Sequence, residues 1–198
     1  MVAKDGTGDY STVTEALAAL GEEGEPALIY IKKGVYKERL TIRRPFVTFE
    51  GEDMNETVIT YNLGAKMEME DGSRRGTFRS YSVLIDTHDF TARNLTFENS
   101  AGLGALVGQA LALYVDGDRI LFDRCRMLAS QDTIFTGPLP PKEIEPNGFI
   151  GPKQYAPRIN GRHYYKDCFI RGDIDFIFGS ATAYFENCEL YSQDIGRE

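Results

Sequence analysis

The sequence predicts an all-β protein built as a parallel β-helix, with one short helix at its N-terminal end. From residue 27 onward, short runs of β-branched and aromatic residues alternate with Gly, Asn and Asp. An aromatic-x-x-Cys pattern also recurs, in Phe122–Cys125, Tyr165–Cys168 and Phe185–Cys188, and the last two cysteines are 20 residues apart. One coil of a parallel β-helix takes roughly that many residues, so stacking should make these side chains neighbours.

The N-terminal helix is expected over residues 11–20. Thr12 and Glu15 have the spacing of a capping box, and Gly21 or Gly24 is a natural end. We expect this helix to cover the first coil, whose open end would otherwise expose backbone groups and core side chains. The apolar positions that predict it are Val13, Ala16, Leu17 and Leu20.

The strands that follow show few hairpin signals. Asn-Gly occurs only at 147–148 and 160–161, whereas an antiparallel sandwich would carry such turns between successive strands. The clearest strand candidates are residues 28–31, 47–49, 58–60, 83–85 and 111–115.

Residues 137–162 interrupt this rhythm with six prolines and several glycines. A loop of this length inside a compact domain is often a lid or a binding loop. We interpret it as an insertion into an otherwise single domain that spans residues 1–198.

Composition excludes several classes of protein. A net charge of -8 argues against duplex nucleic acid as partner, and no apolar run is long enough to span a bilayer. The residues after Met1 encode no export signal, so the compartment stays open between an intracellular protein and a secreted one whose signal was removed.

The three cysteines, Cys125, Cys168 and Cys188, have two main readings. They are either small buried hydrophobic residues or, for the last two, a disulfide between neighbouring coils. Metal ligation is disfavoured because no CxxC motif or nearby His accompanies them.

Two segments, residues 129–133 and 172–179, set a carboxylate among apolar and aromatic residues. Burial raises the pKa of such a group and hydrogen bonding lowers it, so two carboxylates in one cleft can divide acid and nucleophile roles. A Ser-His-Asp triad has little support, because His88 and His163 are the only histidines and no Gly-x-Ser-x-Gly elbow occurs.

Five ordered blocks resemble the pectin methylesterases, a carbohydrate esterase family. They are residues 2–10, 30–38, 108–113 (GQALAL), 130–133 (SQDT) and 173–179 (DIDFIFG). The resemblance implies a right-handed parallel β-helix that hydrolyses methyl esters of galacturonic acid in pectin, releasing methanol, with no cofactor and no metal.

The resemblance also implies roles for individual residues. Asp175 would be the nucleophile and Asp132 the acid and then the base, while Gln109 and Gln131 would stabilise the oxyanion with their neutral amides. Asp173 is interpreted as a charged turn residue. We expect the two catalytic aspartates to face one another across a groove, within about 10 Å.

Four further residues are candidates for substrate binding. Phe178 matches a family position that stacks on sugar rings, and Phe135 is an aromatic neighbour of the aspartates. Thr77 and Phe78 resemble the block that supplies a substrate-contacting Thr.

One departure from the family stands out. Its Leu-Gly-Arg-Pro-Trp block is missing, since the chain has no Trp and stops 23 positions after Asp175. We therefore expect the C-terminal coils to be missing and the activity of this chain to be low. The expected partner is methyl-esterified homogalacturonan bound by a monomer, with no nucleic acid and no membrane. The alternatives are a pectin lyase or polygalacturonase, or an inactive or fragmentary pectin-binding β-helix.

Overall fold

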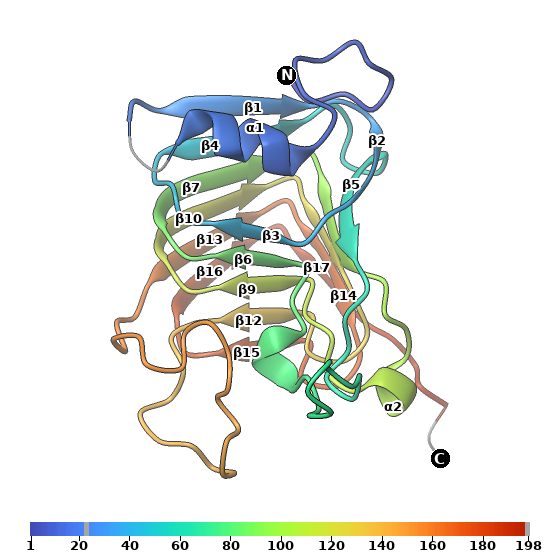
Figure 1. Cartoon of the computed structure of the whole chain (residues 1–198), viewed down its shortest axis with the longest axis vertical. Coiled ribbons are helices and arrows are strands. Elements are labelled where there is room, and N and C mark those ends of the chain that lie inside the picture. Colours follow the sequence, from blue (N-terminus) through green and yellow to red (C-terminus); the bar gives the residue numbers. More distant parts are fainter. Residues whose placement is uncertain (22–23, 197–198) are drawn as a thin grey trace.

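The computed structural model describes residues 1–21 and 24–196, which form a stack of coils built from three parallel sheets (Figure 1). Sheet A contains β1 (Ala27–Ile31), β4 (Val47–Gly51), β7 (His88–Arg93), β10 (Asp118–Asp123), β13 (Arg162–Lys166) and β16 (Thr182–Glu186). Sheet B contains β2 (Gly34–Lys37), β5 (Thr57–Tyr61), β8 (Thr96–Asn99), β11 (Arg126–Leu128), β14 (Phe169–Gly172) and β17 (Glu189–Ser192). Sheet C contains β3 (Leu40–Ile42), β6 (Val83–Ile85), β9 (Leu113–Val115), β12 (Ile134–Thr136) and β15 (Ile177–Gly179).

Each strand pairs in parallel with its counterpart in the next coil, which confirms the predicted parallel β-helix. Three short helices, α1 (Val13–Leu20), η1 (Thr77–Arg79) and α2 (Gly104–Val107), lie outside the sheets. None of the described helices is long and apolar enough to cross a membrane.

Helix α1 covers the first coil, as predicted, although it begins at Val13 rather than at residue 11 (Figure 1). Thr12 and Glu15 form the capping box, and Gly21 is the C-cap with φ 72°. The Glu38 carboxylate accepts hydrogen bonds from the amides of Val13 and Thr14. This second cap joins the helix to the chain between β2 and β3.

The aromatic-x-x-Cys repeat marks the turn from sheet A to sheet B. The rings of Phe122, Tyr165 and Phe185 stack inside the coils, with centroids 5.0 and 4.6 Å apart. Each of these turns contains one residue with φ between 51° and 54°, in the left-handed region, and the next residue enters the core. Those turn residues are Asn94, Arg124, Asp167 and Asn187, and the core residues after them are Leu95, Cys125, Cys168 and Cys188.

The three cysteines are free thiols that follow one another in register through the stack. Cys125 and Cys168 are buried and Cys188 is half-buried. Burial raises the pKa of Cys168 to about 12, so this thiol stays protonated at neutral pH.

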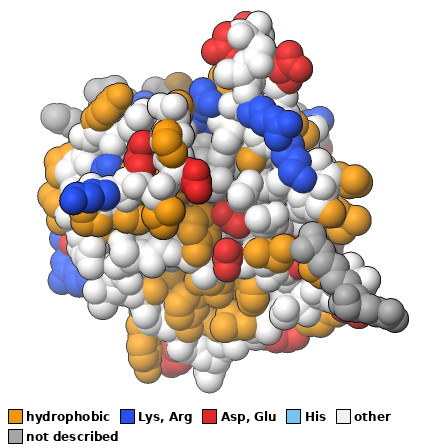
Figure 2. Space-filling view, turned by 90° about the horizontal axis from the view of Figure 1, so that it is seen from below, with side chains coloured by type: hydrophobic (Ala, Val, Ile, Leu, Met, Phe, Trp, Pro, Cys, Tyr) orange, Lys and Arg blue, Asp and Glu red, His pale blue; other side chains and the backbone are white. Residues whose placement is uncertain are grey.

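Residues 137–161 connect β12 to β13 without a helix or strand and project from the lower part of the stack (Figure 1). Seen from below, hydrophobic side chains gather over the last coil (Figure 2), where Phe185 and Ile177 are only partly buried and Tyr184 is 64% exposed.

Candidate functional site

The site lies on the outer face of sheet C. Side chains alternate along each strand, so Leu113 and Ile134 enter the main core while Tyr114 and Phe135 point outward. A second apolar cluster covers this outer face, which is why both faces of the sheet are buried. The cluster comprises Phe78, Tyr81, Leu84, Leu111, Tyr114, Phe135, Leu139 and Phe149, with Phe178 packed against it.

Asp132 and Asp175 occupy equivalent positions on successive coils. The register of β12 and β15 pairs Ile134 with Ile177, and the Asp132 amide donates a hydrogen bond to the Ile174 carbonyl at 3.0 Å. Neighbouring strands lie about 4.8 Å apart, so the aspartates are adjacent although they are 43 positions apart in the sequence. They lie side by side in the stack, and the groove between them stays a prediction. Both have positive φ, 62° and 47°.

The two carboxyl groups have different environments, because Asp132 is 6% exposed whereas Asp175 is exposed. Burial raises the pKa of Asp132 to about 7, the charges of Asp175 and Asp173 add to this, and a hydrogen bond from Gln131 opposes it. Asp132 can therefore hold a proton near neutral pH. Among residues 1–21 and 24–196, no lysine or arginine forms an ion pair with either aspartate.

Gln109 and Gln131 lie on successive coils, and Gln131 directly precedes Asp132. The Gln131 carbonyl accepts a hydrogen bond from the amide of Ala110 at 3.0 Å, which fixes the two glutamines next to each other along the stack. Gly104 lies against Gln131, since a Cβ at this glycine would come within 2.7 Å of the Gln131 Cβ. The backbone segments that carry the two glutamines thus lie side by side on successive coils.

The predicted substrate-binding aromatic residues are brought together. The Phe78 ring, on η1, lies 5.0 Å from Phe135, and Phe135 lies 5.0 Å from Phe178. These three rings line a cavity of about 260 Å³ together with Pro138, Pro140 and Phe149. Thr77 is half-buried at the start of η1, and its carbonyl accepts hydrogen bonds from the Ser80 amide and hydroxyl.

Asp173 lies directly after β14, in the turn that also contains Asp175. Its carboxylate accepts a hydrogen bond from the adjacent Ile174 amide at 2.6 Å, which is a local turn interaction. The described residues contain no group of His, Cys, Asp or Glu side chains that could hold a metal ion.

The sequence reasoning missed the attachment of the 137–161 loop to sheet C. Lys153 bonds the Asp86 carboxylate, and its Nζ lies 4.0 Å from a carboxylate oxygen of Asp116. Phe149 packs on Phe78 with ring centroids 6.0 Å apart. A signal for the attachment point was present, because Asp86 and Asp116 each directly follow an apolar strand of sheet C.

Comparisons with known proteins identify the family. The pectinesterase family model matches residues 1–138 and 155–197, and the internal gap in this match, residues 139–154, falls within the long loop. Pectinesterase 31 of Arabidopsis thaliana is 36% identical over 98% of this chain and 56% of the relative. The chain spans 56% of this relative and 29% of another, so it covers only part of the length of the curated relatives it matches.

Solved structures agree with this assignment. A pectin methylesterase in complex with a hexasaccharide superposes with a TM-score of 0.82 at 33% identity, covering 98% of this chain and 55% of that chain. The pectin methylesterase from carrot gives a TM-score of 0.77 at 34% identity, covering 98% of this chain and 53% of that chain. With most of its residues matched by the family model and its coils matched by these structures, the chain belongs to the pectinesterase family.

Proposed function

We propose that this chain hydrolyses the methyl esters of galacturonic acid units in pectin, with Asp175 as nucleophile and Asp132 as acid and base. The observation that carries the proposal is the pair itself: a buried carboxyl whose pKa is raised to about 7, adjacent to an exposed carboxylate. Two carboxyl groups in different environments are suited to opposite proton states, as the two roles require.

In the first half of the reaction, the Asp175 carboxylate attacks the ester carbonyl carbon. Gln109 and Gln131 donate amide hydrogen bonds to the oxygen that becomes negative. Protonated Asp132 gives its proton to the departing methoxide, which leaves as methanol. The carbon–methoxide bond breaks, and an anhydride between Asp175 and the galacturonate remains.

In the second half, Asp132 is a carboxylate and acts as a base. It takes a proton from a water molecule, whose oxygen attacks the anhydride carbonyl. The anhydride bond breaks, Asp175 regains its carboxylate, and Asp132 is protonated again for the next cycle. Every atom of the ester and of one water is accounted for in methanol and the free galacturonic acid.

Substrate binding is assigned to Thr77, Phe78, Phe135 and Phe178. The aromatic cavity of about 260 Å³ offers ring faces for sugar units, and a related pectin methylesterase was solved with a hexasaccharide. Because both aspartates and both glutamines come from one chain, a monomer suffices for the chemistry.

The test is methanol release from highly methylated pectin by D175N, with D167N as its control. Asp167 is also a turn residue with positive φ, 52° against 47°, in the turn between sheets A and B, so both changes remove one carboxylate from a similar backbone conformation. We expect D175N to lose about three orders of magnitude in rate and D167N to keep at least half of it. Comparable rates for the two variants would refute the assignment of Asp175.

A further inference from the structure

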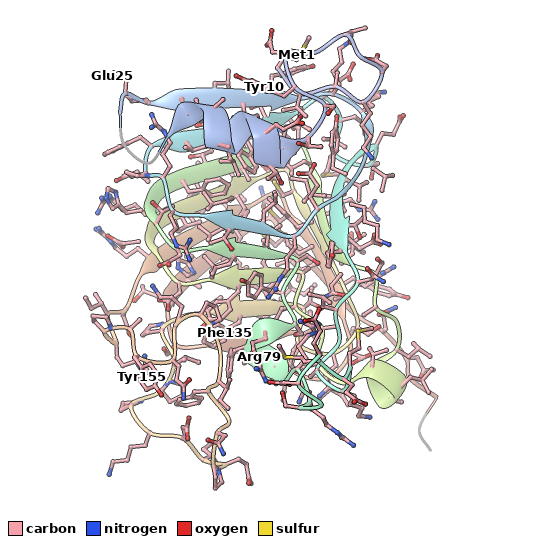
Figure 3. The ribbon with its side chains drawn as sticks, viewed as in Figure 1. Met1, Tyr10, Glu25, Arg79, Phe135 and Tyr155 are labelled. Carbon is pink, nitrogen blue, oxygen red and sulfur yellow. The ribbon has the colours of Figure 1, made fainter. Side chains whose placement is uncertain are left out.

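Three arginines gather on the same side of the molecule as the proposed site. Arg39 lies between β2 and β3, Arg75 precedes η1 and Arg79 ends it. Arg39 donates to the Arg79 carbonyl at 2.9 Å, and its guanidinium lies 4.0 Å from the centre of the Tyr81 ring. Arg79 in turn donates to the carbonyls of Arg75 and Arg74. In Figure 3, Arg79 is labelled beside η1, near Phe135, which contacts Phe78 of that helix.

This arginine cluster (Arg39, Arg75 and Arg79) has no matching carboxylate. Within the part of the chain that the structure describes, none of the three forms an ion pair, and the buried Nε of Arg75 has no hydrogen-bond partner. Burial lowers the pKa of Arg75, and the positive charges of Arg39 and Arg79 lower it further. The positive charge of Arg79 lowers the pKa of Asp71, but the two side chains form no ion pair. Three adjacent cations without a directly bound anion are unfavourable, and they are unexpected in a chain of net charge -8.

The cluster is joined to the proposed site by hydrogen-bonded backbone. The Gly76 amide donates to the Ala65 carbonyl at 2.9 Å, and the Ala65 amide donates to the Gln109 carbonyl at 2.8 Å. Thr77, a candidate for substrate contact, follows Gly76 directly. Along the stack, β6 begins just after Tyr81 and lies two strands from β12, which is about 10 Å. A polymer that crosses the outer face of sheet C can therefore reach both places.

The chemistry of the cluster identifies its ligand. A guanidinium presents a planar set of N–H donors that matches the two oxygens of a carboxylate. The proposed reaction turns a neutral ester into such a carboxylate on the same polymer. We propose that Arg39, Arg75 and Arg79 form a subsite for the free carboxylate of an unesterified galacturonate unit, while an esterified unit of that polymer lies at Asp132 and Asp175. This inference rests on the proposed function. It implies that the preferred substrate is an ester whose neighbouring units, on the side of the polymer that lies toward Arg75, are unesterified.

Arg75→Gln is the variant of choice, because Arg39 and Arg79 also hold backbone carbonyls whereas Arg75 shows an unpartnered N–H. Arg93→Gln is the matched control: it removes the same charge on sheet A, where Arg93 lies 3.8 Å from Asp123. Binding of fully de-esterified and of fully methylated oligogalacturonides is measured by calorimetry at low ionic strength. We expect R75Q to weaken binding of the acidic oligomer about tenfold, R93Q less than twofold, and neither to change binding of the methylated oligomer.

Arg75→Lys controls for misfolding. It keeps the charge but lacks the planar set of N–H donors, so it should recover part of the acidic-oligomer binding. Equal binding of the acidic oligomer by R75Q and R93Q, or failure of R75K to bind better than R75Q, would overturn the subsite. Methanol release by the unmodified chain is recorded in parallel. If the unmodified chain releases methanol but R75Q binds the acidic oligomer normally, only the subsite is refuted. If R75Q binds the acidic oligomer more weakly but the unmodified chain releases no methanol, the subsite is supported and the proposed hydrolysis is refuted.

Discussion

Replacing Asp132 by Asn should make the protein more stable, and the gain should depend on pH. In the folded chain, burial and the nearby carboxylates raise the pKa of Asp132 from 3.8 to about 7. The folded state therefore binds the proton more tightly than the unfolded state. The stability that this proton provides is fully present below about pH 4, falls as the pH rises, and is lost above about pH 7. Three units of pKa correspond to about 4 kcal/mol, an upper bound for the effect.

The Asn side chain has a similar shape and no charge to desolvate, so D132N does not incur this loss. We expect the difference in free energy of unfolding between D132N and the unmodified chain to be small at pH 4 and to reach about 2–4 kcal/mol at pH 8. Urea unfolding from pH 4 to pH 8 measures it, with D167N as control. A difference that stays constant over this range would refute the raised pKa and, with it, the assignment of Asp132 as the acid.

Two other changes test the surroundings of the site. Gly104→Ala should lower the rate of methanol release about tenfold or more, because its Cβ would meet the Gln131 Cβ at 2.7 Å and Oε1 at 2.8 Å and displace this amide. Leu106→Ala, at an exposed position of the same helix, should leave the rate unchanged. Equal rates of methanol release by the two variants would contradict the role of Gln131. Lys153→Met should lower the free energy of unfolding by about 1–3 kcal/mol and speed proteolysis within residues 137–161, because Asp86 and Asp116 lose their shared cation. Lys142→Met, at an exposed position of the same loop, should do neither. Identical cleavage patterns of the two variants would contradict the attachment of the loop to sheet C through Lys153.

The repeat could be predicted from sequence because each coil places like residues over like. The aromatic-x-x-Cys pattern corresponds to one column of the core, in which the rings of Phe122, Tyr165 and Phe185 stack. The capping box of α1 is equally local, since Thr12 and Glu15 satisfy backbone amides within one turn. Patterns of this kind need no knowledge of the rest of the chain.

The arrangement of the site could not be predicted in the same way. A repeat of 20 residues does not align Asp132 with Asp175, which are 43 positions apart because the 137–161 loop enlarges that coil. The expectation that the two carboxylates lie close together therefore came from the family resemblance and not from the repeat. The arginine cluster depends on hydrogen bonds that join residues 65, 76 and 109, and no local pattern encodes those.

The proposed division of roles between the aspartates is consistent with their positions on successive coils. Two unit charges about 5 Å apart repel by about 3 kcal/mol at an effective dielectric constant of 20, so a pair on successive coils favours holding one proton. The proton goes to the group that gains more from neutrality, and that is Asp132, which is 6% exposed, rather than exposed Asp175. An identical register thus yields two chemically different carboxyl groups, and their difference in burial determines which of them holds the proton.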